Sequence, residues 1–202
     1  MSKARQRDFF TKQTDYAPRR SSLGGETSKG HRKLRRPLDR KRPIHLVLKS
    51  SHAKGALSML SRRNRLEVKR IFQQRARQFG VTIHGFENMG NHIHAALTFR
   101  RKEEFQNFLR TVSALIARHV TGARKGNPFG KRFWDHLAFT RVVTGLRSWK
   151  GLLGYLKKNQ IEREGGQAAR KAIEAYERAT AKARRTGRDV WEILVAESAV
   201  AS

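Results

Sequence analysis

The sequence predicts an α+β fold in which one antiparallel sheet carries helices on a single face. Three observations predict it. Short apolar stretches of strand length alternate with longer stretches of helical period, in the order β-α-β-β-α-β. A tight turn separates the two middle strands, which therefore form a hairpin. The stretch 92–99 alternates so that only one of its faces is apolar throughout. Together these features indicate the ferredoxin-like arrangement.

The first half of the sheet is predicted from 44–86. The stretch 44–48 (Ile-His-Leu-Val-Leu) follows Pro43 and reads as the first strand. A helical period then runs over 57–79, with apolar residues near one stripe and basic residues over most of the remainder. Gly80 is placed to end that helix, and 81–86 predicts the second strand.

The strand at 92–99 separates two sets of side chains by alternation. One set is His92, His94, Ala96 and Thr98; the other is Ile93, Ala95, Leu97 and Phe99. The second set is apolar and is expected to face the helices. The two imidazoles then lie about 7 Å apart at Cα, close enough to reach one ion on the uncovered face. Two structural histidines are the alternative for such a pair.

The second half follows a similar order. Six apolar residues at 105–116 keep the spacing of one helix face, and Glu103 and Glu104 lie at the end where the helix dipole favours acids. A basic, glycine-rich loop is predicted over 121–132. The stretch 133–143 then predicts the fourth strand, either continuous or interrupted near Asp135-His136, and completes the sheet.

A further helix is predicted over 146–160. Its apolar stripe consists of Trp149, Leu152, Leu153 and Leu156. Tyr155 and Asn159 lie off the centre of that stripe, on one flank and one turn apart. A tyrosine placed only for packing would fall within the stripe, which makes Tyr155 a candidate functional residue. Residues 166–202 are rich in helix formers and predict a helical C-terminal extension, with a short final helix near 190–195.

Charge is the dominant feature of the composition. The 202 residues carry 45 Lys and Arg against 16 Asp and Glu, for a net charge of +29. This favours a polyanionic partner, with nucleic acid first and an anionic membrane surface second. No apolar run approaches the ~20 residues of a spanning helix, and we expect no membrane partner and a soluble intracellular protein. The chain has no cysteine, which excludes disulfides, thiolate metal sites and cysteine nucleophiles.

Three regions are predicted. Residues 1–43 hold 14 Lys and Arg against 4 Asp and Glu, with no periodicity, and are expected to be a disordered basic arm. Residues 44–165 are expected to form the main folded domain, and 166–202 the extension. The alternative role for the arm is a solubilising tail.

A histidine pair on an open sheet face, a tyrosine with an amide at i+4 and a basic surface have one chemistry in common, phosphodiester transesterification. Neutral imidazoles bind a divalent cation that also contacts a DNA phosphate. A tyrosine phenolate then attacks in line and leaves a covalent phosphotyrosine. Asn159 supplies a neutral oxygen one turn from Tyr155.

These residues resemble a known family. Asn91-His92-Ile93-His94, Phe133-Trp134-Asp135 and the segment Gly154 to Asn159 look like motifs of the single-tyrosine HUH transposases, especially the bacterial REP-associated tyrosine transposases. The resemblance runs from about residue 37 to 160. It implies Tyr155, His92 and His94 as catalytic residues, and His92, His94 and Asn159 as ligands of Mg²⁺ or Mn²⁺. It also implies single-stranded DNA with hairpin structure as substrate, and a cytoplasmic, nucleoid-associated bacterial protein. A monomer and a homodimer are both expected possibilities.

Other residues are candidate DNA contacts. The predicted phosphate contacts are Arg100, Arg101, Lys102, Arg124, Lys125, Lys131 and Arg132. Phe129, Phe133 and Trp134 either stack on bases or pack in the core, and core packing is favoured for Trp134. His45 is expected to be structural or to contact DNA. The alternative function is a non-catalytic, ferredoxin-like nucleic-acid-binding protein, either a domesticated transposase relative or an RNA binder.

Overall fold

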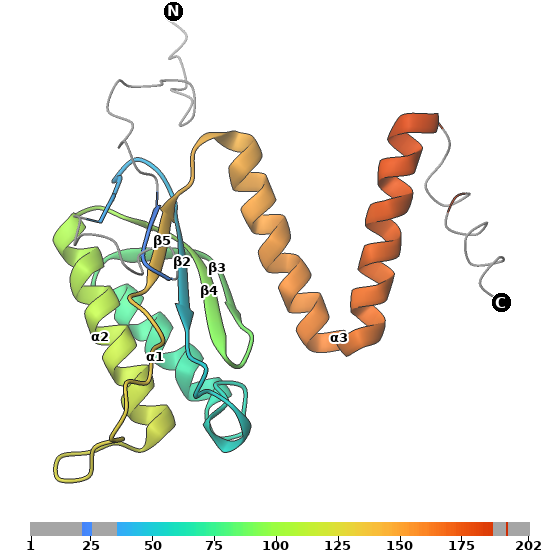
Figure 1. Ribbon diagram of the computed structural model, residues 1–202. Helices are drawn as coiled ribbons and strands as arrows, with labels where there is room; N and C mark the ends of the chain where they lie inside the picture. The colour runs from blue at the N-terminus through green and yellow to red at the C-terminus, as the bar shows by residue number, and fades with distance from the viewer. Residues whose placement is uncertain (1–21, 26–35, 188–192, 194–202) are drawn as a thin grey trace, which may run out of the picture. The chain divides into compact units, whose positions relative to one another are not determined.

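The computed structural model describes residues 22–25, 36–187 and 193 (Figure 1). The chain divides into two compact units, Met1–Leu156 and Lys157–Ser202, and each is described by itself. The sheet belongs to the first unit. Among the described residues, no helix has the length and apolar character needed to cross a membrane.

The first unit has the predicted order of elements. They are β2 (Ile44–Lys49), α1 (Arg65–Gln78), β3 (Val81–Asn88), β4 (His92–Phe99), α2 (Lys102–Thr121) and β5 (Phe139–Val142). The strands are antiparallel and lie in the order β1-β5-β2-β4-β3, where β1 (Ser22–Leu23) is an added edge strand. The predicted α+β class, with its β-α-β-β-α-β core, is confirmed.

One face of the sheet is covered by α1 and α2, which lie side by side on it (Figure 1). Alternate residues of β2 and β4 are buried there: Ile44, Leu46, Leu48, Ile93, Ala95, Leu97 and Phe99. They pack against aromatic residues of the helices, among them Phe72 and Phe108. The prediction that the apolar set of 92–99 faces the helices is confirmed.

The opposite face, called the histidine face below, carries His45, His84, His92 and His94. It is not entirely free as expected, because the start of α3 (Gly145–Thr186) covers part of it. Leu152 and Leu156 of that helix form a small buried cluster with Ala96 and Val143. Gly85 permits this approach: a Cβ added there would lie 2.6 Å from Cδ1 of Leu156. The helix that carries Tyr155 is therefore seated directly on the sheet.

The fourth strand is shorter than predicted. Only Phe139–Val142 pair with β2, and 133–138 form a loop. Asp135 accounts for the difference, since its Oδ1 accepts hydrogen bonds from both the backbone N–H and the hydroxyl of Ser51, each at 2.8 Å. The backbone N–H of Asp135 also donates to the Lys49 carbonyl at 3.0 Å. These bonds tie the loop across the end of β2.

The first helix begins later than the predicted 57–79. Gly55–Leu57 form a 3₁₀ turn, and α1 starts at Arg65. The intervening residues are tied to the β3–β4 hairpin instead. The backbone N–H of Met59 donates to the Gly90 carbonyl, and the Asn88 side-chain amide donates to the Met59 carbonyl, both at 2.8 Å. These long-range bonds override the local helical pattern.

Part of the predicted disordered arm is ordered, so that prediction is wrong for 22–25 and 36–43. Ser22 and Leu23 pair with β5, and Arg36 donates to the Ala138 carbonyl and the Thr140 hydroxyl at 2.7 and 2.6 Å. Gly24 has φ +97°, and a Cβ there would lie 2.1 Å from the Ala138 carbonyl oxygen, so only glycine fits. Residues 1–21 and 26–35 of the arm lie outside the described residues.

The helix predicted over 146–160 is longer than expected. It continues as α3 to Thr186, with a break at Gly166 where φ is 59°. Within the second unit, Lys158 and Glu177 form an ion pair across that break at 3.0 Å. The domain boundaries after 43 and 165 stay predictions. The short helix predicted near 190–195 lies outside the described residues, apart from Ile193.

Candidate active site

The register of the sheet places the two predicted histidines at one end of β4. His92 pairs with Lys49 and His94 with Val47. Because alternate residues of a strand share a face, both imidazoles lie on the histidine face. Their ring centroids are 4.7 Å apart and the rings are nearly perpendicular, at 88°. The two side chains can thus act on a single bound group.

Tyr155 reaches the same place from α3. Its hydroxyl oxygen lies 3.3 Å from Nε2 of His94, and the two ring centroids are 5.2 Å apart. The tyrosine is 43% exposed, whereas His94 is only 7% exposed. Leu152 and Leu156 hold this part of the helix on the sheet, as described above. A hydroxyl open to solvent is thereby held against a buried imidazole.

His45 is the neighbour that the sequence did not assign to the site. Its Nε2 lies 3.2 Å from Nδ1 of His94, and the two rings are near parallel with centroids 5.4 Å apart. A signal for this position was available, because the apolar residues at 44, 46 and 48 put His45 on the histidine face. Its partner could not be foreseen, since that depends on the register of β2 against β4.

The hydrogen-bond contacts are consistent with one set of tautomers for these rings. Nδ1 of His92 lies 2.6 Å from the side-chain oxygen of Asn91, which only accepts, so this Nδ1 is protonated. When the Tyr155 hydroxyl donates to Nε2 of His94, the His94 Nδ1–H donates to Nε2 of His45. In this arrangement His92 and His94 both keep a lone pair on Nε2.

The three imidazoles are held neutral. Burial, followed by the neighbouring His92 and His45, lowers the pKa of His94 to about 3. Burial and the nearby Arg141 lower the pKa of His45 to about 4. Burial and Lys49 also lower the pKa of His92. At neutral pH these rings are lone-pair donors, and a group with a pKa of about 3 is a weak general base.

Asn159, the third predicted ligand, lies one helical turn after Tyr155 and belongs to the second unit. Its placement beside the histidines stays a prediction. Within the described part of the chain, no three His, Cys, Asp or Glu side chains gather as a metal site. A cation would therefore need ligands beyond the two imidazoles, and amide or phosphate oxygens are the available chemistry.

The predicted DNA contacts fall into two groups at opposite ends of α2. Arg100, Arg101 and Lys102 are exposed where the helix begins. The other four lie in the loop after it: Arg124, Lys125, Lys131 and Arg132. The 20 residues of α2 separate the groups by about 30 Å of helix. Since β4 and α2 run in opposite directions, the second group lies toward the end of the sheet that carries His92.

Comparisons with known proteins give weak likenesses to solved structures, of which two are described. No protein-family model matches the sequence, and no curated protein matches it. A REP-associated tyrosine transposase, solved bound to a REP hairpin, is 14% identical with a TM-score of 0.49, over 67% of this chain and 74% of that one. A proposed transposase from Deinococcus radiodurans R1 is 16% identical with a TM-score of 0.39, over 63% and 97%. At such TM-scores the function has to be inferred from the site itself.

Proposed function

We propose that the protein cleaves and rejoins single-stranded, hairpin-bearing DNA through a phosphotyrosine at Tyr155. One observation carries the proposal: the Tyr155 hydroxyl lies 3.3 Å from Nε2 of His94, with the His92 ring alongside. A nucleophile beside two neutral imidazoles suits attack on a phosphodiester. The net charge of +29 and the resemblance of the sequence motifs to HUH transposases support DNA as the substrate.

The proposed step exchanges one ester for another. The Tyr155 hydroxyl gives up its proton to solvent, and its oxygen attacks the phosphorus in line with the leaving 3′ oxygen. The bond from phosphorus to that oxygen breaks, and the freed 3′ hydroxyl takes up a proton. The 5′ phosphate stays esterified to tyrosine. A 3′ hydroxyl that attacks this ester reverses the step, so rejoining needs no ATP.

His94 orients the nucleophile in this proposal. Because burial lowers its pKa to about 3, His94 is better suited to accept a hydrogen bond from the phenol than to remove its proton at neutral pH. His45 holds the other nitrogen of the same ring at 3.2 Å and so fixes its rotation. Together they limit the directions in which the tyrosine oxygen can point.

The donor set fits a divalent cation. His92 and His94 would hold Mg²⁺ or Mn²⁺ through Nε2, with Asn159 as the proposed amide ligand. At His94 the cation would take the lone pair that otherwise accepts the hydrogen bond from Tyr155, so His94 orients the phenol only while no cation is bound. When bound, such an ion polarises the phosphodiester and stabilises charge on its oxygens. Imidazole nitrogen is softer than the oxygen ligands that Mg²⁺ prefers, so both ions belong in the test.

The test is formation of a covalent adduct. A 5′-labelled hairpin and a 3′-labelled hairpin, each with single-stranded flanks, are incubated with protein and Mn²⁺ or Mg²⁺, then separated under denaturing conditions. We expect a protein–DNA adduct that carries the label 3′ of the cleavage. Tyr155→Phe should abolish the adduct and leave binding within about twofold of wild type, since it removes one hydroxyl. Tyr176→Phe, which changes an exposed tyrosine of the second unit, should leave the adduct intact.

Two outcomes would contradict the proposal. An adduct that persists in Tyr155→Phe would assign the nucleophile to another residue. Binding without an adduct, over a range of hairpins and both metals, would favour a non-catalytic nucleic-acid-binding protein.

A further inference from the structure

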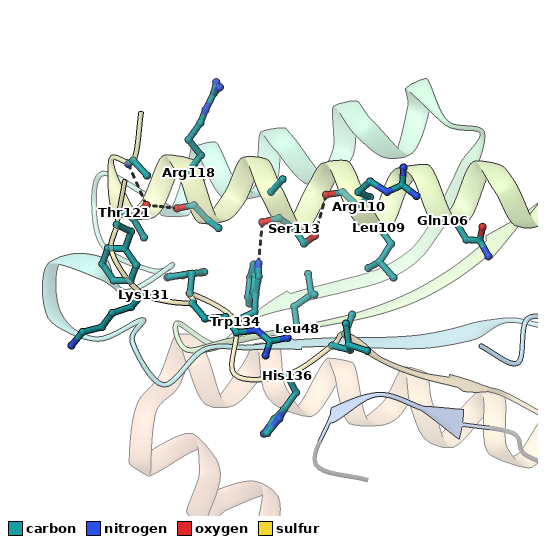
Figure 2. Close-up of a pocket in the computed structure, with 18 of the residues that line it drawn as sticks. Leu48, Gln106, Leu109, Arg110, Ser113, Arg118, Thr121, Lys131, Trp134 and His136 are labelled. Carbon is teal, nitrogen blue, oxygen red and sulfur yellow. Dashed lines mark hydrogen bonds between the residues drawn. The ribbon is translucent and has the colours of Figure 1, made fainter. Parts of the chain in front are cut away.

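A recess lies between α2 and the loop 121–138, away from the tyrosine and the histidine pair (Figure 2). It has a volume of about 840 Å³. Leu48, Leu109, Phe133 and Trp134 contribute to its apolar lining. Leu48 and Phe133 belong to the buried core, so the recess opens onto the side of the sheet that α2 covers.

The aromatic wall of this recess is held in place. The indole N–H of Trp134 donates to the Ser113 carbonyl at 2.9 Å, and Figure 2 shows this ring standing against α2. Its ring meets Phe133 nearly at right angles, with centroids 4.8 Å apart. Phe129 is half-buried, 6.4 Å from Phe133 and 6.0 Å from the His52 ring. A wall of fixed rings with one half-exposed phenyl group suits a flat aromatic ligand.

The rim of the recess is cationic. Arg110, Arg118, Lys131 and Arg132 are exposed side chains at its edge, and the lining includes no Asp or Glu. In the described part of the chain, none of these four forms an ion pair within 4.0 Å. Flat apolar walls with uncompensated positive charge match a ligand that joins an aromatic base to phosphate.

Two smaller recesses extend this surface. One, of about 510 Å³, shares Arg118 and Phe129 with the first and adds Arg124 and Lys125. The other, of about 270 Å³, shares His136 with the first and reaches Val47 and Lys49, the residues paired with His94 and His92. The surface therefore leads from the end of the histidine pair around the sheet to the aromatic wall. Its length suits a strand of several nucleotides better than one free nucleotide.

We infer that this recess binds an unpaired nucleotide of single-stranded DNA. The base lies against Phe129 and the neighbouring phosphates along Lys131 and Arg132. The inference deepens the proposed function, on which it rests for the identity of the polymer. It names residues that hold the single strand at a distance from the cleaved phosphate. Loop residues 121–132 thus act as a strand guide and do not serve only as a charged surface.

Binding is measured without cleavage, in the Tyr155→Phe background with EDTA. The probes are a labelled 20-nucleotide single strand and the same sequence as a duplex. Lys131→Glu/Arg132→Glu should weaken single-strand binding by at least tenfold, because two phosphate contacts become repulsive. Arg65→Glu/Lys69→Glu makes the same charge change on exposed positions of α1 and should weaken it by less than about threefold.

The base contact is tested separately. Phe129→Ala should weaken single-strand binding by about tenfold, as expected for loss of one stacking surface, and Phe129→Trp should restore it. An abasic nucleotide moved along the strand should weaken wild-type binding at one position and leave Phe129→Ala unaffected there. Urea unfolding of both variants shows whether the fold is retained.

The inference is overturned if the two charge variants weaken binding equally, or if no abasic position affects the wild type differently from Phe129→Ala. Equal losses for single strand and duplex would also overturn it. None of these readings depends on adduct formation. The proposed function can therefore fail while the recess still binds DNA, and the reverse outcome is equally visible.

Discussion

Adjacent residues of β4 point to opposite faces of the sheet and meet different surroundings. Ile93 is fully buried beneath the helices and belongs to the apolar core. His94 lies on the histidine face, with its ring between His45 and the Tyr155 hydroxyl. One face is organised for packing and the other for polar contacts. The comparison teaches that stability and chemistry can be changed separately by substituting neighbours on one strand.

The largest expected effect is on chemistry, from the histidine side of this comparison. His94→Ala removes the group that contacts Tyr155, together with one proposed cation ligand, and should slow adduct formation by at least about 100-fold. The measurement is the time course of adduct formation on the hairpin substrate. The control is His84→Ala, on the same face but bonded to Thr98, which should change the rate by less than threefold. Similar losses in both variants would contradict a special role for His94.

The next effect is on stability, from the packing side. Ile93→Ala leaves a cavity under the helices and should lower the free energy of unfolding by about 2–5 kcal/mol. Urea unfolding measures it, and adduct formation per folded molecule should stay within a few-fold of wild type. A loss below 1 kcal/mol, or a loss of chemistry in fully folded protein, would show that the two faces are not separable in this way.

The smallest expected effect is the change in the free energy of unfolding with pH. In the unfolded chain, His45 and His94 have the ordinary pKa of 6.5. In the folded protein, the pKa is about 4 for His45 and about 3 for His94. The unfolded state therefore binds more protons below pH 6.5, and stability is lost as the pH falls from there toward 4. Between pH 7 and 6 we expect the two histidines together to lower the free energy of unfolding by about 1.4 kcal/mol. Urea unfolding at both pH values measures this change.

The matched control for the pH effect is His45→Gln/His94→Gln, which has no imidazole to protonate at these positions. The decrease between pH 7 and 6 should be smaller in this variant. An equal decrease would assign the pH dependence to other groups.

Elements with a strong local pattern were predictable. The alternation over 92–99 predicted both the strand and which of its side chains face the helices. A period of two leaves only one way to bury Ile93, Leu97 and Phe99 together. The apolar stripe of α3 likewise contains Leu152 and Leu156, which pack in a buried cluster, and it left Tyr155 outside the stripe. That this cluster would lie on the histidine face was not predicted. These inferences needed only neighbours in the chain.

Features that depend on distant partners were not predictable. Asp135 ends the fourth strand early by bonding to Ser51, and Asn88 holds the segment before α1 in place by bonding to Met59. No local sequence pattern identifies the partner of either residue. The contact between His45 and His94 is of the same kind, since it requires the register of two strands far apart in the chain. The roles of Tyr155, His92, His94 and Asn159 stay predictions.

The added edge strand has a practical consequence for shortening this chain. Ser22 and Leu23 cover the outer edge of β5, and Arg36 occupies the carbonyl of Ala138. A protein trimmed to start at Pro37, on the view that everything earlier is a dispensable tail, would present bare backbone donors and acceptors along that border. An exposed sheet edge of this kind can pair with a strand from another chain and so promote aggregation. Trimming should therefore stop before Ser22.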